Sequence, residues 1–245
     1  MSIQETIAQK LATIAANSPR VYAAGEANGI NAFFDDYLQN GTRTNFVGAF
    51  SGKGWTNTAF KPNHNITAIG NASYMFYTSA ISGDLVQILQ DLGITLSTTG
   101  VTNATQLFGS ATAITRLGVI DISSATNTTG AFAFLTDLET IDEIITSATT
   151  SYVSNTFASL PNLKNITFTG VIATNITLAS PLLTAASLTS TVNALSATAT
   201  GKTATFSTAA VNKAFETSAG ANDGKTSAAW TALVGTKPNW SIAYA

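Results

Sequence analysis

The stretch FASLPNLKNITFTG, residues 157–170, decides the fold of this chain. Its aromatic first residue is followed by apolar residues at steps of three, and then by a short strand-like end. The same pattern begins at Phe132 and at Phe108, so the three copies start 24 and 25 residues apart. A fixed period in this range is typical of a solenoid, in which each unit buries its apolar edge only against its neighbours.

A fourth, degenerate copy precedes these three. It contains Phe76 and Ile81, begins 32 residues before Phe108, and holds an inserted helix expected over residues 84–92. The copies end in the strand-like segments RLGVIDIS, TIDEIITS and KNITFTG. We therefore expect an α/β solenoid of about four units over residues 68–177. The expected repeat-core residues are Phe76, Phe108, Ile114, Leu117, Phe132, Leu135, Leu138, Ile141, Phe157, Leu160, Leu163 and Ile166.

Residues 1–18 predict a short amphipathic helix. Ile3, Ile7, Leu11 and Ile14 recur at steps of four, four and three, which places them on one helix face. A helix of this length is marginal alone, so the apolar stripe needs a partner. Two alternatives remain open: docking on its own chain, or a short oligomeric bundle that anchors the protein.

Two further regions flank the repeats. Residues 19–67 are rich in aromatic residues and glycine, including Phe46, Phe50, Trp55 and Phe60, and we expect them to cover the first repeat. Residues 178–245 lose the period and predict a mixed α/β cap. Its expected elements are helices in 180–195, 209–215 and 227–234, a strand in 201–208 and a closing strand or tail in 240–245. A strand of this cap that paired with the last repeat would cover the open edge of the sheet.

Composition excludes several classes of function. Only 10% of the residues are charged and the net charge is −2, which argues against nucleic-acid binding because that needs clustered Lys and Arg. The chain has no cysteine, so it depends on neither disulfides nor thiolate zinc. The N-terminus lacks the apolar core of a secretory signal, and no apolar run approaches the roughly 20 residues of a membrane span. We expect a protein that is not inserted in a membrane.

Residues suited to catalysis are few. The single histidine, His64, lies in a turn-like segment, and no G-x-S-x-G motif is present. The one acidic cluster flanks two apolar anchors, so a solvated outer face explains it, with calcium binding and glycoside hydrolysis as alternatives. We expect no catalytic, cofactor-binding or metal-binding residues. The cluster comprises Asp137, Glu139, Asp142 and Glu143.

Eight Asn-x-Ser/Thr triplets occur in the chain. A chain this rich in Asn, Ser and Thr produces such triplets by chance, and we interpret them as composition rather than as glycosylation sites. The triplets begin at Asn40, Asn65, Asn71, Asn103, Asn127, Asn165, Asn175 and Asn239.

The block SNTFASLPNLKNITFTG resembles the BspA-type leucine-rich repeat. The segments IAQKLATIAANSPRVYAAGEANG and FFDDYLQNGTRTNFVGAFSGKGW are similar to the start of phage-encoded structural proteins that carry such repeats. This resemblance implies a non-enzymatic protein on the surface of the virion, in a head-fibre, head-decoration or tail-fibre role. It implies contact with other virion proteins or a host cell-surface molecule, and a homo-oligomer with a trimer favoured.

Two other functions remain open. The first is a free-standing leucine-rich-repeat adhesin that binds a carbohydrate or a protein. The second is a polysaccharide hydrolase that acts through the acidic cluster. We favour the virion protein, because repeats without a convergent polar site offer a surface rather than a catalytic cleft.

Overall fold

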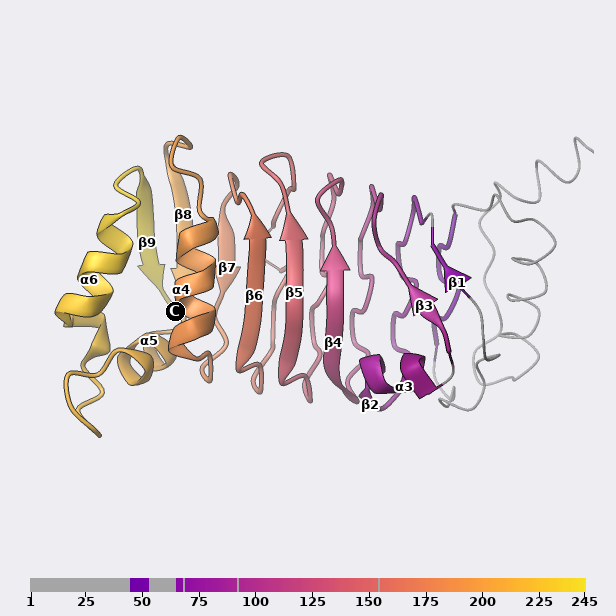
Figure 1. Ribbon diagram of the computed structural model, residues 1–245, viewed down its shortest axis with the longest axis horizontal. Helices are drawn as coiled ribbons and strands as arrows, with labels where there is room; N and C mark the ends of the chain where they lie inside the picture. The colour runs from indigo at the N-terminus through magenta and orange to yellow at the C-terminus, as the bar shows by residue number, and fades with distance from the viewer. Residues whose placement is uncertain (1–44, 53–64, 68, 92, 154) are drawn as a thin grey trace, which may run out of the picture.

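The structure is a computed structural model, and it describes residues 45–52, 65–67, 69–91, 93–153 and 155–245. In this part of the chain successive coils stack side by side along one axis, so the described molecule is elongated (Figure 1). Its strands are β1 (Asn65–Ile66), β2 (Gly83–Asp84), β3 (Thr95–Leu96), β4 (Ile114–Asp121), β5 (Thr140–Thr146), β6 (Asn165–Gly170), β7 (Ile176–Leu178), β8 (Lys202–Phe206) and β9 (Trp240–Tyr244). Its helices are α3 (Leu85–Asp91), α4 (Ala185–Ala194), α5 (Thr208–Ala214), the 3-10 turn η2 (Gly224–Thr226) and α6 (Ala228–Gly235).

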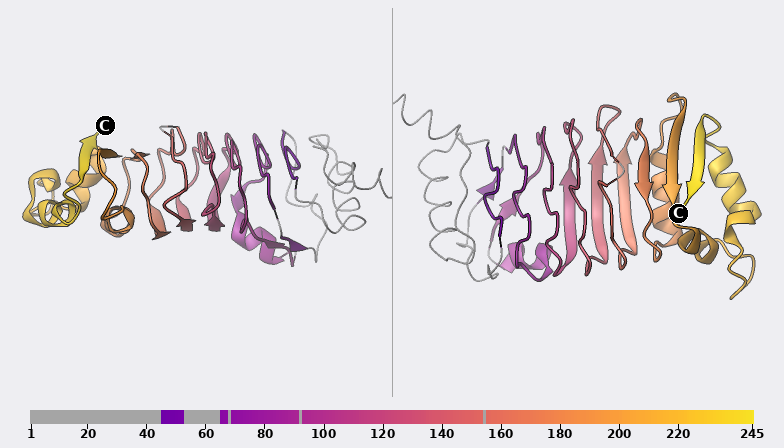
Figure 2. Two further views of the ribbon diagram at one scale, coloured as in Figure 1. Left: turned by 90° about the horizontal axis from the view of Figure 1, so that it is seen from above. Right: turned by 180° about the vertical axis from the view of Figure 1, so that it is seen from behind.

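One side of the stack is a parallel sheet in the order β2-β4-β5-β6, which we call the front sheet. Leu117 of β4 lies opposite Ile141 of β5, and Ile141 lies opposite Ile166 of β6. Strands β4, β5 and β6 lie in the three strand-like segments expected from sequence. Parallel neighbours require a crossover connection, and here the chain crosses to the opposite side of the stack and returns (Figure 2).

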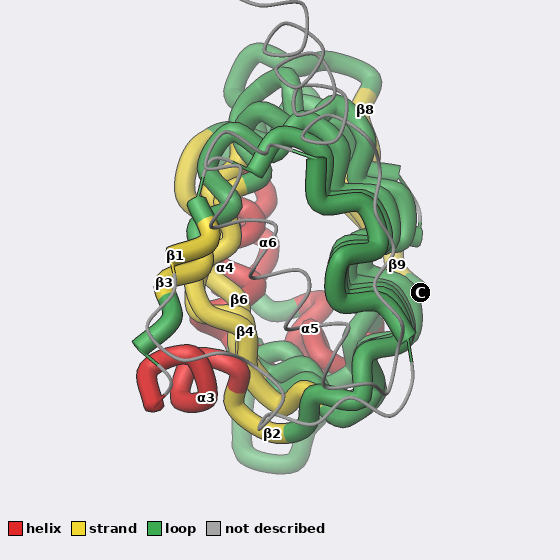
Figure 3. The backbone as a smooth tube through the Cα atoms, turned by 90° about the vertical axis from the view of Figure 1, so that its right-hand side faces the viewer, coloured by secondary structure: helices red, strands yellow, loops and turns green. Residues whose placement is uncertain are grey.

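The return segments form the opposite side, which we call the rear wall. They are not regular strands, but alternate backbone amides of one segment donate to carbonyls of the next. Tyr74 N–H, for example, donates to Thr105 O at 2.8 Å, and Gln106 N–H donates to Thr129 O at 2.8 Å. Viewed along the stack, the segments superpose as one sharply bent wall that faces the front sheet (Figure 3). The rear segments are residues 45–52, 71–79, 103–111, 127–135 and, apart from residue 154, 152–160.

A column of stacked phenylalanine rings fills the centre between the two walls. Neighbouring ring centroids lie 5.1, 5.1, 6.1 and 5.2 Å apart, with interplanar angles of 21° or less. Such aromatic pairs contribute about 0.5–1.5 kcal/mol each beyond their buried area. The column therefore joins coils that are distant in sequence. Its members are Phe50, Phe76, Phe108, Phe132 and Phe157.

The twelve expected repeat-core residues all lie in this interior, where none is more than 4% exposed. The column also extends beyond the expected repeats into residues 19–67, which were expected to cover the first repeat: Phe50 stacks on Phe76. β5 adds one further step of three, from Ile141 to Ile144, and both are buried because the pairing with β6 has a register irregularity between them.

Helix α3 accounts for the long spacing between Phe76 and Phe108. It is inserted between β2 and β3, within the range expected for it. At seven residues it is too short to be stable alone. Asp84 supports its first turn, because the carboxylate accepts hydrogen bonds from Val86 N–H at 2.8 Å and Gln87 N–H at 3.1 Å.

A helix of the C-terminal region covers the last strand of the front sheet. The sequence suggested that a cap strand could pair with the last repeat, and β8 does pair with β7, whose Ile176 and Thr177 end the expected repeat region. No cap strand pairs with β6, because β7, β8 and β9 form a separate parallel sheet. Helix α4 lies beside β6 instead (Figure 1). Ser187 Oγ accepts from Ile166 N–H at 2.9 Å, and Ser190 Oγ accepts from Phe168 N–H at 2.8 Å. Two hydroxyls one helical turn apart thus replace the missing strand.

Candidate interaction surfaces

A repeated asparagine turn shapes the rear wall. Asn45, Asn71, Asn103 and Asn127 follow one another in parallel bridges from coil to coil. Each side-chain Oδ1 accepts a hydrogen bond from the backbone N–H two residues later, at 3.0–3.2 Å. This contact closes a local turn at the same place in four of the five rear segments, in the manner of an Asx turn.

Hydroxyl groups reinforce three of these turns. The side chains of Ser73, Thr105 and Thr129 donate to the same Oδ1 atoms at 2.5, 2.7 and 2.8 Å. Three of the eight Asn-x-Ser/Thr triplets, those at Asn71, Asn103 and Asn127, are therefore part of the repeat, which the interpretation as composition missed. The available signal was position, since each of these asparagines, like Asn45, stands five residues before a phenylalanine of the column.

Two further positions of each rear segment that begins with an asparagine adopt left-handed backbone geometry. They lie three and seven residues after the asparagine, and glycine occupies some of them, as at Gly48, Gly52 and Gly130. Other coils place larger side chains there, although this region costs an L-residue about 1–2 kcal/mol. The non-glycine examples are Tyr74 (φ 57°), Thr78 (φ 51°), Gln106 (φ 51°), Ser110 (φ 59°) and Phe134 (φ 61°), and Ser159 (φ 56°) is the counterpart in the fifth segment.

Two of these strained residues are exposed aromatics. Tyr74 is 42% exposed and Phe134 is 50% exposed. The Tyr74 ring meets the half-buried Tyr77 ring edge-on, with centroids 5.4 Å apart. The intervening coil carries Gln106 and Ser110, which are half-buried, and the Gln106 Oε1 atom is buried without a hydrogen-bond partner among the described residues. We call Tyr74, Tyr77, Gln106, Ser110 and Phe134 the rear strip.

Charge is confined to the other side of the stack. The five rear segments contain no Asp, Glu, Lys or Arg. The front sheet and its turns carry the acids of the repeats, and Arg116 of β4 joins two of them. Its guanidinium donates to Asp142 at 2.9 and 2.8 Å and to Asp84 at 3.1 Å. These carboxylates, Asp142 first, raise the pKa of Arg116 above its ordinary value. Because Asp84 also caps α3, Arg116 ties the inserted helix to the sheet.

The acidic cluster expected from sequence does not converge. Asp142 pairs with Arg116, and Glu139 pairs with Lys164 at 3.1 Å, while Asp137 stands exposed at the turn before β5. Within the described residues no group of three or more acidic, histidine or cysteine side chains is placed to hold a metal ion. The cluster therefore behaves as a salt-bridged outer face.

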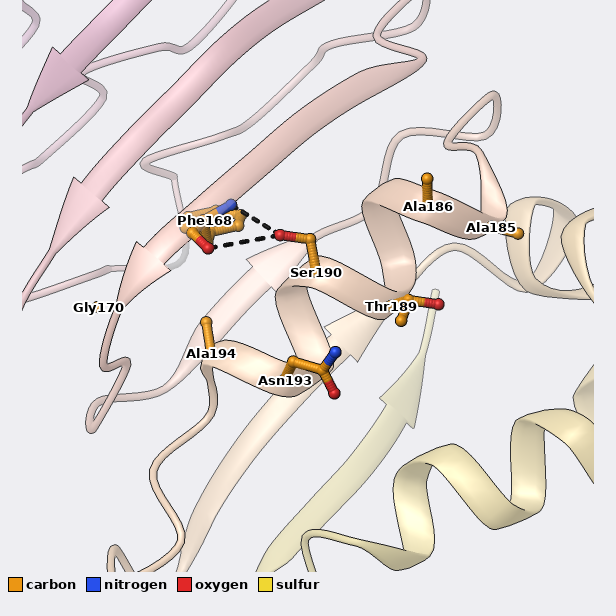
Figure 4. A pocket seen from close by; sticks show the side chains of 8 residues that line it. All are labelled: Phe168, Gly170, Ala185, Ala186, Thr189, Ser190, Asn193 and Ala194. Atoms are coloured by element: carbon orange, nitrogen blue, oxygen red, sulfur yellow. Dashed lines mark hydrogen bonds between the residues drawn. The ribbon is translucent and has the colours of Figure 1, made fainter.

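Two grooves open beside the front sheet. An open groove of about 670 Å³ runs between β6 and α4, where it is lined by Phe168, Ala185, Thr189, Ser190 and Asn193 among others (Figure 4). An apolar groove of about 280 Å³ lies between α3 and β4. Neither groove is lined by a titratable side chain, so neither offers a general acid or base.

Several predicted residues lie outside the described part of the chain. They include the stripe of the N-terminal helix, the single histidine and two aromatics of the expected N-terminal cap. Among the described helices none is long and apolar enough to cross a membrane. The residues outside the description are Ile3, Ile7, Leu11, Ile14, Trp55, Phe60 and His64.

The described surfaces are thus a charge-free wall of turns on one side and a salt-bridged sheet flanked by two short helices on the other. No protein-family model, curated protein or solved structure matches the chain. Its function must therefore be inferred from its own residues.

Proposed function

We propose that the chain is a non-enzymatic structural and adhesion protein of a phage particle, built as a short α/β solenoid of BspA-type leucine-rich repeats. It displays the stacked coils toward a host surface or a neighbouring virion protein. The observation that carries this proposal is the continuous phenylalanine column, which joins at least five coils into one rigid body with two long exposed sides.

The distribution of polar groups supports display rather than catalysis. On the rear wall the asparagine and hydroxyl groups are used to close turns, and on the front side Asp84, Asp142 and Glu139 are used in ion pairs. A catalytic site needs a nucleophile or acid–base pair that converges on a cavity. The two grooves of the described residues lack such a pair.

The attachment belongs to residues 1–18 in this proposal. Their apolar stripe holds the copies together, with a trimer favoured, and fixes them to the particle. The full chain should then be an oligomer in solution, whereas a variant with Ile3, Ile7, Leu11 and Ile14 all replaced by serine should be a folded monomer.

Native mass measurement tests this directly. A matched control replaces four polar positions of the same segment, Gln4, Thr6, Gln9 and Lys10, by alanine and should keep the oligomer. An apolar-stripe variant with the same mass as the full chain would overturn the role of the helix. Circular dichroism of both variants confirms that the repeats remain folded.

A further inference from the structure

We propose that the apolar groove between α3 and β4 binds residues 1–18 of a neighbouring copy of this chain. This inference rests on the proposed function and deepens it, because it names the surface that the apolar stripe of residues 1–18 meets. In this contact Ile7 and Leu11 enter the groove, and Lys10 pairs with Glu143 at its edge.

The groove has a buried apolar floor and one exposed apolar side chain at its rim. Gly118 of β4 lets α3 lie close to the sheet, because a Cβ atom at this position would lie 3.1 Å from Val86 Cγ2. Val119, the next residue, is 52% exposed, and no side chain that lines the groove is charged. Such a groove suits apolar side chains. The floor residues, none more than 6% exposed, are Leu85, Ile94 and Ile120.

The volume of the groove fits one turn of an amphipathic helix. Its volume of about 280 Å³ is roughly twice that of a cavity of about 150 Å³ that holds one benzene ring. The groove therefore takes about two branched apolar side chains. Amphipathic helices dock in such grooves through residues spaced at i and i+4. Ile7 and Leu11 have this spacing and lie in the middle of the apolar stripe.

Charge complementarity points to this stripe as the occupant. Glu143 of β5 lies opposite Val119 of β4 in the register of the sheet, so both side chains are on the same face beside the groove. Among the described residues no ion pair engages the Glu143 carboxylate. Residues 1–18 contain two charged side chains. At helical spacing Lys10 flanks the apolar stripe, whereas Glu5 falls on the opposite face, so the docked stripe brings a cation to the acid.

A second copy supplies one stripe for every groove. Residues 19–44 connect the stripe to residue 45, where the described rear wall begins, and they span at most roughly 85 Å. This length is enough to reach a neighbouring copy. A stripe of one copy in the groove of the next is a heterologous contact, and contacts of this kind close into rings. A ring of three copies agrees with the trimer of the proposed function.

Exchange of the two charges tests the contact in the full chain. Lys10→Glu and Glu143→Lys should each raise the dissociation constant between copies roughly tenfold, measured by analytical ultracentrifugation over a dilution series, because each replaces an attraction by a repulsion. The double variant should restore the constant of the unmodified chain. Lys10→Glu combined with Asp137→Lys, at an exposed acid in the turn before β5, is the matched control and should restore nothing. Lys10→Ala removes one exposed pair, worth less than about fivefold, and keeps the oligomer.

Disulfide trapping shows which copy supplies the stripe. The chain has no cysteine, so copies that carry Leu11→Cys are mixed with differently tagged copies that carry Val119→Cys. A disulfide between the two kinds of copy is expected. Disulfides only between two Leu11→Cys copies would mean that the stripes pack on one another, and an internal disulfide in a chain that carries both substitutions would mean that the stripe fills its own groove. Either result overturns the proposal, as does a double charge exchange that restores no affinity.

These outcomes are separable from the proposed function. An oligomer that survives both charge reversals, but dissociates when the apolar stripe is replaced by serine, would remove the groove as the partner and leave the role of residues 1–18 intact. A full chain that is a monomer at every concentration would overturn both.

Discussion

Phe132 and Phe157 stack with ring centroids 5.2 Å apart and planes only 5° from parallel, although they belong to different coils. Phe108 lies on the other side of Phe132 at 6.1 Å. Each inner ring of the column is thus held by rings from both neighbouring coils. A coil separated from the stack would lose both contacts, which is why the coils are expected to fold together.

Phe132→Ala tests the column. Removing a fully buried ring that touches two others should lower the free energy of unfolding by about 3–5 kcal/mol, measured by urea denaturation. Val119→Ala, at a side chain that is 52% exposed, should change it by less than about 0.5 kcal/mol. Phe132→Leu serves as the milder variant if alanine prevents folding, and it should lie between the two. Equal stabilities for the alanine variants would contradict the packing described.

Phe134→Gly should leave the stability of the fold almost unchanged. The left-handed backbone at φ 61° costs about 1–2 kcal/mol, which glycine removes. The variant loses about 0.5–1 kcal/mol to unfolded-chain entropy and roughly 1 kcal/mol of burial with the half-exposed ring, so the free energy of unfolding should stay within about 1 kcal/mol of its starting value. The neighbouring Ala133→Gly is the control, because Ala133 has ordinary backbone geometry and should lose stability. If both variants lose stability alike, Phe134 is not strained.

The hydroxyls of α4 can be tested one at a time by amide hydrogen exchange. Ser187→Ala should accelerate exchange of the Ile166 amide, and Ser190→Ala should accelerate exchange of the Phe168 amide, each without a comparable effect on the other. Each variant removes the only acceptor shown for one edge amide, a loss of about 1–3 kcal/mol in local protection. Acceleration of both amides by either variant would mean that α4 covers the edge as a body instead.

The hydrogen bonds that hold the loop between α5 and η2 should weaken at acidic pH. Lys213 lowers the pKa of Glu216 below its ordinary value of 4.5, chiefly through their hydrogen bond, and Thr217 lowers the pKa of Asp223 below 3.8. Because the folded pKa values lie below the unfolded ones, the stabilisation is present above about pH 4.5 and is lost as the pH falls through the folded values.

Protection factors for the Gly220 and Thr217 amides, which donate to Glu216 and Asp223, should therefore fall below pH 4.5. The double variant Glu216→Gln, Asp223→Asn should show no such fall. Protection factors that do not change with pH in the unmodified chain would contradict the assignment of this effect to Glu216 and Asp223.

The strand of each coil was predictable because the buried apolar residues that lead into it recur at a fixed spacing in the sequence. Ile114, Leu138 and Ile166 follow an aromatic residue at regular steps, so the strands and the interior could be located from sequence. The C-terminal helices could also be placed, because α4 and α6 have apolar faces and serine or threonine caps. The phenylalanines of the rear segments were found by the same spacing, but the asparagine turns and left-handed positions of the rear wall were missed, because they leave no mark in the apolar spacing.

The candidate surface was harder to predict for a related reason. Nothing in their residue types marks Tyr74 and Phe134 as left-handed, since that geometry is imposed by the neighbouring coils. The acidic cluster was visible in sequence, but its partners were not, because Arg116 lies on a different strand from Asp142. Pairs formed across coils depend on register, which a single sequence does not show.

The claim that this is a display protein of a phage particle is tested most directly by quantitative mass spectrometry of particles purified on a density gradient. The account predicts peptides of this chain in the particle band, at a fixed ratio to the major capsid protein, and their loss from that band when Ile3, Ile7, Leu11 and Ile14 are replaced by serine. A chain found only in the soluble fraction of the lysate, with none in the particle band, would contradict it.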